Sequence, residues 1–156
     1  MLTTNTNDSA ERETIDGMTV YRLPVVKIIQ SRLPILLPGR KVRQIVAELS
    51  QWRPRVVVTN TRFFPTSVLG IRFARRRGLP SLHIDHGSQH IQVGSRLGNR
   101  VSELIDHTVG SWVLRHATRC VGVSRSVADF LAHLGRADAG VLYNGVDPGA
   151  FHETKG

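Results

Sequence analysis

Four short clusters of polar residues follow apolar segments along the chain, and their side chains can bind anions or transfer protons. Histidine can donate a hydrogen bond to a phosphate or to a developing charge, and arginine pairs with anions. The clusters are Asn60-Thr61-Arg62, Asp85-His86-Gly87-Ser88, Ser124-Arg125-Ser126 and Asn144-Gly145-Val146-Asp147. If each apolar segment is a parallel strand, the clusters share the edge of the sheet where ligands of such folds bind. We therefore expect them to converge on one crevice.

His86 is the candidate catalytic residue. It directly follows a short apolar segment and precedes Gly87, whose missing side chain would let a ligand approach the backbone closely. The imidazole could donate a hydrogen bond to a phosphate or to a charge that develops during a reaction. A histidine in such a loop can also have a purely structural role, and the residues alone leave this alternative open.

Arg62 is a candidate anion ligand. A guanidinium at the end of a strand, beside a helix N-terminus, reinforces the anion site that free backbone amides form. The alternative is a solvated surface arginine. Asn60 and Thr61 could cap the helix that follows. Ser124 is predicted to cap a helix and not to act as a nucleophile, because no G-x-S-x-G motif surrounds it.

The sequence predicts neither a metal site nor a bound cofactor. His83, His86 and His90 lie near Asp85 in the sequence. However, His83 and Asp85 share one face of a strand, and His86 should leave on the other. Cys120, the single cysteine, supports neither a zinc motif nor an internal disulfide. The glycines form no G-x-G-x-x-G motif after a first strand, so a dinucleotide site lacks support.

The elements that must position these residues are predicted from the apolar spacing. Helices are predicted over 40–52, 65–77, 97–116 and 127–134, and strands over 19–22, 56–58, 81–85, 119–123 and 141–143. The β-branched run 56–58 is typical of a strand buried on both faces of a parallel sheet. Strands that alternate with helices predict an α/β, Rossmann-like fold, with helices on both faces of the sheet. The residues of the long helix expected to face the core are Val101, Leu104, Ile105, Trp112 and Val113.

The chain has the size of one domain, because 156 residues, 40% of them hydrophobic, can bury a single core. Residues 1–17 are polar and are predicted to be a disordered lead. We expect the folded domain over 18–151. Residues 152–156 are expected to begin an interdomain linker.

The excess of 21 basic over 12 acidic residues, a formal charge of +9, should attract anions. Nucleic acid is not the expected partner, because the run Arg75 to Arg77 ends a helix and is not interleaved with aromatic residues. The polar start does not resemble a signal peptide, and the apolar stretch 23–37 is too interrupted to span a bilayer. A cytoplasmic location is expected. The basic face and the loop 33–37 could rest on the inner face of the membrane.

The wording of the four clusters, in this order, resembles the N-terminal, acceptor-side domain of family-four GT-B glycosyltransferases. The resemblance covers roughly Gly17 to Phe151. The segments that carry it are Val57 to Phe64, Leu82 to Ser88, Val121 to Val127 and Leu142 to Asp147. The resemblance implies transfer of a hexose from a nucleotide-sugar to a glycan or a lipid-linked acceptor, with retained anomeric configuration and without a metal.

The resemblance also implies roles for single residues. By motif position, His86 matches the family's active-site histidine, which contacts the transferred sugar and stabilises the transition state. Arg62 and Ser88 would face the acceptor or phosphates, and Asn144 would lie at the passage to a second domain. The implied substrate-binding residues are Arg62, Gly87, Ser88, Asn144 and Gly145.

Two departures from the family pattern shape the functional expectation. Members begin with a strand and a Gly-rich loop that approach the donor phosphates, and they continue into a donor domain. Neither part is recognised in these 156 residues. We therefore expect a half transferase, truncated at both ends, that does not transfer sugar alone. The alternative is an acceptor- or anion-binding module that pairs with a separate donor-domain chain.

Overall fold

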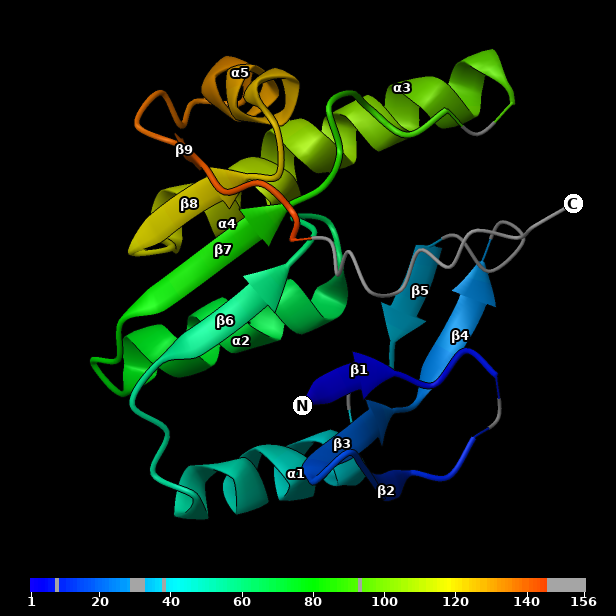
Figure 1. Cartoon of the computed structure of the whole chain (residues 1–156). Helices are drawn as coiled ribbons and strands as arrows, with labels where there is room; N and C mark the ends of the chain where they lie inside the picture. The colour runs from blue at the N-terminus through cyan, green and yellow to red at the C-terminus, as the bar shows by residue number, and fades with distance from the viewer. Residues whose placement is uncertain (8, 29–32, 38, 93, 146–156) are drawn as a thin grey trace, which may run out of the picture.

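A four-stranded parallel sheet forms the centre of the computed structural model, which describes residues 1–7, 9–28, 33–37, 39–92 and 94–145 (Figure 1). The strands, in spatial order, are β6 (Val57–Asn60), β7 (Ser81–Asp85), β8 (Arg119–Gly122) and β9 (Gly140–Val141). Helices alternate with these strands along the chain. The predicted α/β, Rossmann-like fold is confirmed.

The helices between and beside these strands gather on one face of the sheet. They are α2 (Pro65–Arg76), α3 (Arg96–Ile105), the π-helix η1 (Asp106–Gly110), α4 (Ser111–His116) and α5 (Arg125–His133). One core joins α2, α4, α5 and β8, and its buried members are Ile71, Val113, Leu114, Ala117, Cys120, Val127, Leu131 and Leu134. The sequence predicted helices on both faces. The four parallel strands lie side by side in the same order as they follow along the chain. Right-handed crossovers between such strands return each of these helices to the same face.

The strand β6 lies at the edge of this sheet and is less buried than predicted. Thr59 faces the helices and is buried, but Val58 is 51% exposed. The open side borders a cavity of about 460 Å³ between β6, α2, α1 (Arg40–Gln51) and the start of the chain. Met1, Val46 and Phe73 are among its lining residues. The prediction of burial on both faces is wrong because no helix of the core covers this side.

The first residues form a small sheet of their own, so the prediction of a disordered lead is wrong. Its strands are β1 (Leu2–Thr4), β2 (Arg12–Ile15) and β3 (Met18–Leu23), in the order β1-β3-β2. Strand β3 buries Val20, Tyr21 and Leu23, and its neighbours satisfy its backbone. Asp16 and Gly17 have φ of 50° and 77° and connect β2 to β3 directly. Two residues with positive φ favour this kind of tight hairpin.

The following segment also pairs where a loop was predicted. Strand β4 (Val25–Ile28) is antiparallel to β5 (Leu33–Leu36). The helix α1 that comes next matches the predicted helix 40–52 within one residue.

The long helix predicted over 97–116 is interrupted by a turn of π-helix. Leu104 is 62% exposed and Val101 also faces solvent, so the predicted buried face holds only in its second half, where Val113 is buried. A π turn adds a residue to the helical repeat and rotates the faces on either side of it. Asp106 and Gly110 occupy the buried side of that turn.

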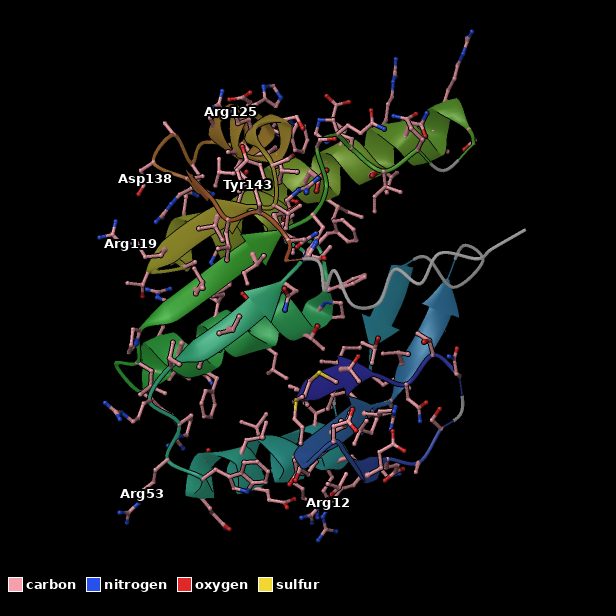
Figure 2. All side chains as sticks on the ribbon, viewed as in Figure 1. Arg12, Arg53, Arg119, Arg125, Asp138 and Tyr143 are labelled. Carbon is pink, nitrogen blue, oxygen red and sulfur yellow. The ribbon has the colours of Figure 1, made fainter. Side chains whose placement is uncertain are left out.

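Much of the positive charge lies at the surface. Arg12, Arg53, Arg119 and Arg125 extend from the edges of the molecule into solvent (Figure 2). Across the described residues, every helix is too short or too polar to cross a membrane.

Candidate active site

The polar clusters predicted at the strand ends meet at the carboxyl edge of the parallel sheet. The amide of Thr61, after β6, donates to the carbonyl of Ile84, 3.0 Å away in β7. The amide of Val123, after β8, donates to the carbonyl of Asp85 at 3.1 Å. These backbone contacts hold three of the four clusters side by side.

The cluster after β9 is described only in part. Asn144 and Gly145 are exposed, and Val146 and Asp147 lie outside the described residues. The amide of Leu142 donates to the carbonyl of Gly122 at 2.9 Å, which keeps the segment beside β8.

Arg62 points into the protein and not toward a ligand. The backbone turns at Thr61, where φ is 63°, and the Arg62 side chain after it is 0% exposed. Its Nε and Nη2 donate to Asp106 Oδ1 and Oδ2 at 2.9 and 3.0 Å, and its Nη1 donates to Asp85 Oδ1 at 2.8 Å. The expectation that Arg62 faces an acceptor or phosphate is wrong, because two carboxylates already enclose the guanidinium.

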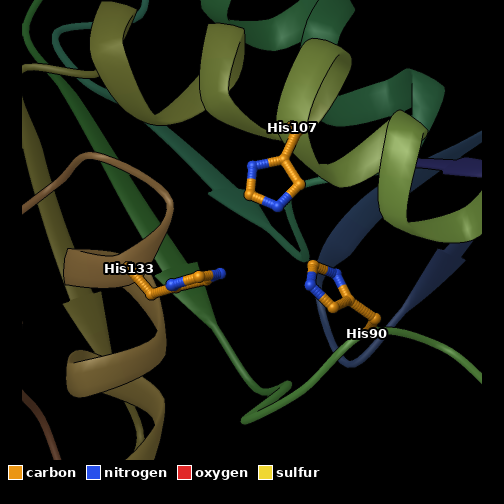
Figure 3. A group of neighbouring side chains, drawn as sticks. All are labelled: His90, His107 and His133. Carbon is orange, nitrogen blue, oxygen red and sulfur yellow. The ribbon is translucent and has the colours of Figure 1, made fainter.

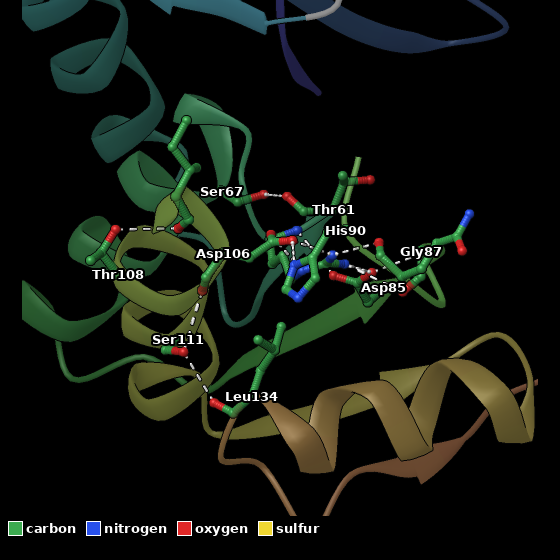
Figure 4. A network of polar contacts seen from close by, with 12 residues as sticks. Thr61, Ser67, Asp85, Gly87, His90, Asp106, Thr108, Ser111 and Leu134 are labelled. Atoms are coloured by element: carbon green, nitrogen blue, oxygen red, sulfur yellow. Dashed lines mark hydrogen bonds and ion pairs between the residues drawn. The ribbon is translucent and has the colours of Figure 1, made fainter. Parts of the chain in front are cut away.

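Asp85 is the hub of this buried network (Figure 4). It accepts hydrogen bonds from the amides of Arg62 and Gly87 at 3.1 and 2.9 Å. Burial by itself raises the pKa of Asp85. The hydrogen bond from His83, the charge of Arg62 and the Gly87 amide outweigh that effect and lower the pKa to about 2. The carboxylate is therefore ionised throughout the neutral range.

His83 extends the network through the sheet. Its Nε2 lies 3.2 Å from Asp85 Oδ2, and its Nδ1 lies 2.9 Å from Thr59 Oγ1. Because an ionised carboxylate only accepts, we assign the proton to Nε2, and the Thr59 hydroxyl then donates to Nδ1. His83 and Asp85 share the buried face while His86 is exposed, as the alternation of the strand predicted.

Arg62 also fixes the loop that follows β7. Its Nη1 and Nη2 donate to the carbonyls of Gly87 and Gln89 at 3.3 and 3.2 Å. A Cβ atom on Gly87 would lie 3.1 Å from Nη1 of Arg62. The missing side chain of Gly87 thus makes room for the guanidinium, which corrects the expectation that it admits a ligand.

The residues that this scaffold leaves accessible are polar. His86 and Ser88 are exposed on the fixed loop, and His86 Nε2 lies 3.5 Å from the side-chain oxygen of Asn60. At that distance the hydrogen bond is weak, and the imidazole remains available to a ligand. Sequence reasoning named His86 and Ser88 but missed Asp106, which is 44 residues from Arg62 and carries no local signal.

The predicted helix caps are present at one cluster and absent at another. Ser124 caps α5, because its Oγ accepts from the amide of Val127 at 3.3 Å. Helix α2 begins without a side-chain cap. Ser67 instead donates to the carbonyls of Asn60 and Thr61 at 2.7 and 2.9 Å.

Comparisons with known proteins match nearly the whole chain to one family. The sequence model described as Glycosyltransferase Family 4 matches residues 1–150, including the residues predicted to be a disordered lead. An uncharacterized glycosyltransferase of Methanocaldococcus jannaschii is 27% identical over 136 residues, which cover 85% of this chain. The match spans 35% of the length of that relative.

Proposed function

The chain belongs to glycosyltransferase family 4, and from that membership we propose that it is the acceptor-side part of a retaining hexosyltransferase. The donor is a nucleotide-sugar and the acceptor is a glycan or a lipid-linked sugar. The observation that carries the proposal is His86, which is exposed at the carboxyl end of β7 on a loop held by a buried arginine. Ligands of open α/β folds bind at this edge.

His86 is the proposed catalytic residue. Its imidazole would donate a hydrogen bond to the sugar as the glycosidic bond to the leaving diphosphate breaks and charge develops. Ser88, on the same loop, is proposed to contact the acceptor. Asn144 and Gly145 are exposed beyond β9 and are proposed to lie at the passage to a donor-binding domain.

In this proposal Arg62 is a positioning residue. Its hydrogen bonds to the carbonyls of Gly87 and Gln89 limit the motion of the loop that carries His86. A loop that is held before substrate arrives loses less entropy when the transition state forms.

Contact with an anionic membrane would bring the chain to a lipid-linked acceptor. Helix α3 exposes Leu97 and Leu104, which are 74% and 62% exposed, and Arg96 and Arg100 flank this apolar stripe. Basic residues beside an apolar helix face favour the surface of anionic lipid.

We expect the chain to sediment with anionic vesicles, and replacing both Leu97 and Leu104 by Ser should reduce the bound fraction. An equal reduction by Leu142→Ser, at another exposed leucine, would contradict a contact at α3.

Acceptor binding is the sharpest test of the proposed function. Saturation-transfer NMR with a panel of oligosaccharides and detergent-solubilised glycolipids should detect binding to the wild-type chain. His86→Ala and Ser88→Ala should weaken it. His116→Ala is the matched control, because that ring packs on Trp112 and bonds to its carbonyl. Absence of binding by a folded wild-type chain, or equal binding by all variants, would contradict the proposal.

The alternative is an acceptor- or anion-binding module that pairs with a separate donor-domain chain, and the charge of +9 favours it. Transfer from radiolabelled nucleotide-sugars distinguishes the two, measured with the chain alone and with a family donor domain added. Transfer that appears only when the donor domain is added would show that the chain works with a separate donor-domain chain. Binding without transfer under either condition would show that the chain only binds.

A further inference from the structure

Three histidines from separate elements converge on one side of the described structure. His90 lies in the loop after β7, His107 in η1 and His133 in the last turn of α5. One ring nitrogen from each lies within 4.8 Å of the others, and Figure 3 shows the three rings pointing toward a common space. No local sequence pattern indicates this group, because consecutive members are 17 and 26 residues apart.

The orientation of His90 is set by the buried network. Its Nδ1 lies 2.7 Å from Asp106 Oδ2, and Asp106 is itself held by Arg62. The carboxylate accepts a hydrogen bond from the N–H at Nδ1, so Nε2 offers its lone pair. The Phe130 ring packs edge-on against His90, with 4.9 Å between the ring centroids, and stacks on His133, with 5.8 Å between the centroids. These contacts orient both histidine rings. In histidines that ligate metals, the N–H of the second ring nitrogen usually donates to a carboxylate, a backbone carbonyl or a water.

We propose that His90, His107 and His133 form a binding site for a divalent transition-metal ion, with zinc the best match. Imidazole ligands suit zinc, copper and nickel, whereas magnesium prefers oxygen. Three protein nitrogens with a water at the fourth position is a common zinc arrangement. This site differs from the histidine group weighed in the sequence, of which it contains only His90.

The three rings need only a small adjustment to reach bonding geometry. With Zn–N distances of about 2.0–2.1 Å, tetrahedral ligand nitrogens lie roughly 3.4 Å apart. His107 and His133 are exposed, so their rings can rotate toward the ion without disturbing the core. The half-buried His90, fixed by Asp106, provides the rigid anchor.

An ion at this site would connect the loop after β7 to η1 and α5. That loop also carries His86 and Ser88, and its Gly87 and Gln89 carbonyls are already held by Arg62. The ion would therefore act by ordering the loop. The inference rests on the histidine geometry alone and stands whether or not the chain binds sugar.

Isothermal titration with zinc chloride tests the site, and visible absorption of added cobalt reports the coordination. We expect the wild-type chain to bind one zinc ion and to give the strong absorption bands of tetrahedral cobalt, with no comparable response to magnesium. The double variant His107→Ala/His133→Ala should lose the bands and bind zinc at least about tenfold more weakly, because two of three ligands are removed. Both side chains are exposed, so the variant should keep the wild-type circular dichroism.

His86→Ala is the matched control, since it removes an exposed histidine from the same loop but outside the group. It should bind zinc as the wild type does. Absence of zinc binding by the wild type, or unchanged binding by the folded double variant, would overturn the proposal. So would stronger binding of inorganic phosphate that depends on His107 and His133, because the group would then be an anion site.

Discussion

The guanidinium of Arg62 is fully buried between Asp85 and Asp106, so its charge is balanced inside the protein. Replacing it by Met leaves two buried carboxylates without a counter-charge. Removing one partner of a buried ion pair costs about 3–5 kcal/mol, and we expect Arg62→Met to lower the free energy of unfolding by that amount. Urea denaturation measures the change.

The control for this variant is Arg119→Met at an exposed arginine, where the expected change is within about 0.5 kcal/mol. Arg62→Lys should also be destabilised, because an ammonium group does not reproduce the planar fork that bonds both carboxylates. Stability of Arg62→Met equal to that of the control would contradict the structural role.

The ionisation of Asp85 makes stability depend on pH. Its pKa is about 2 in the folded chain against 3.8 ordinarily, so the unfolded chain takes up the proton first as the pH falls. The stabilisation by Asp85 is complete above about pH 4 and should be lost progressively as the pH falls toward 2. The free energy of unfolding, measured from about pH 5 down to about pH 3, should fall more steeply for the wild type than for Asp85→Asn. Parallel curves would contradict the low pKa.

At the candidate site, the sequence predicts the positions of some side chains but not the directions in which others point. The positions of His86 and Ser88 at the end of β7 follow from the alternation of strand and helix. The inward turn at Thr61 and the approach of Asp106 do not, because they depend on a positive φ and on a π turn far along the chain. The position of Arg62 at a strand end therefore predicts a ligand contact, whereas in the structure its side chain serves the fold.

Close packing of β8 against α5 depends on Gly122. A Cβ atom there would lie 2.7 Å from the amide nitrogen of Ala128 and 2.8 Å from Val127 Cγ1. The backbone of α5 cannot move aside without opening the core, so Gly122→Ala should lower the free energy of unfolding by about 1–3 kcal/mol or more. Gly145→Ala is the control, since a Cβ there meets nothing within 4 Å. Equal stability of the two variants in urea would show that α5 can shift freely.

At the scale of elements, the predictions held where hydrophobic spacing is decisive. The strands β7 and β8 and the helices α1, α2 and α5 lie close to their predicted ranges. The hairpin at Asp16-Gly17 was missed because polar residues surround a strong turn signal. The exposed side of α3 was missed because an added π residue shifts the helical phase, which periodicity alone does not reveal.

At the scale of the whole molecule, the small N-terminal sheet and the parallel sheet are joined around one cavity. Met1 and Leu2 line it from one side, and Val57 and Phe73 line it from the other. Tyr21 in β3 donates to Glu48 of α1 at 2.6 Å, so the small sheet is also tied to the helix that precedes β6. The first residues should therefore contribute to the stability of the chain as a unit.

Deleting residues 1–17 tests this directly, because the shortened chain begins at Met18 and keeps β3 but loses both of its partner strands. Unpaired backbone along β3 and the uncovered side chains of Val20 and Leu23 should lower the melting temperature by at least about 5 °C. Amide exchange within β3 should accelerate. The control is Asn7→Ala, an exposed position between β1 and β2, which should melt as the wild type does. A deletion that leaves both the melting temperature and the exchange rates unchanged would show that residues 1–17 add nothing to the fold.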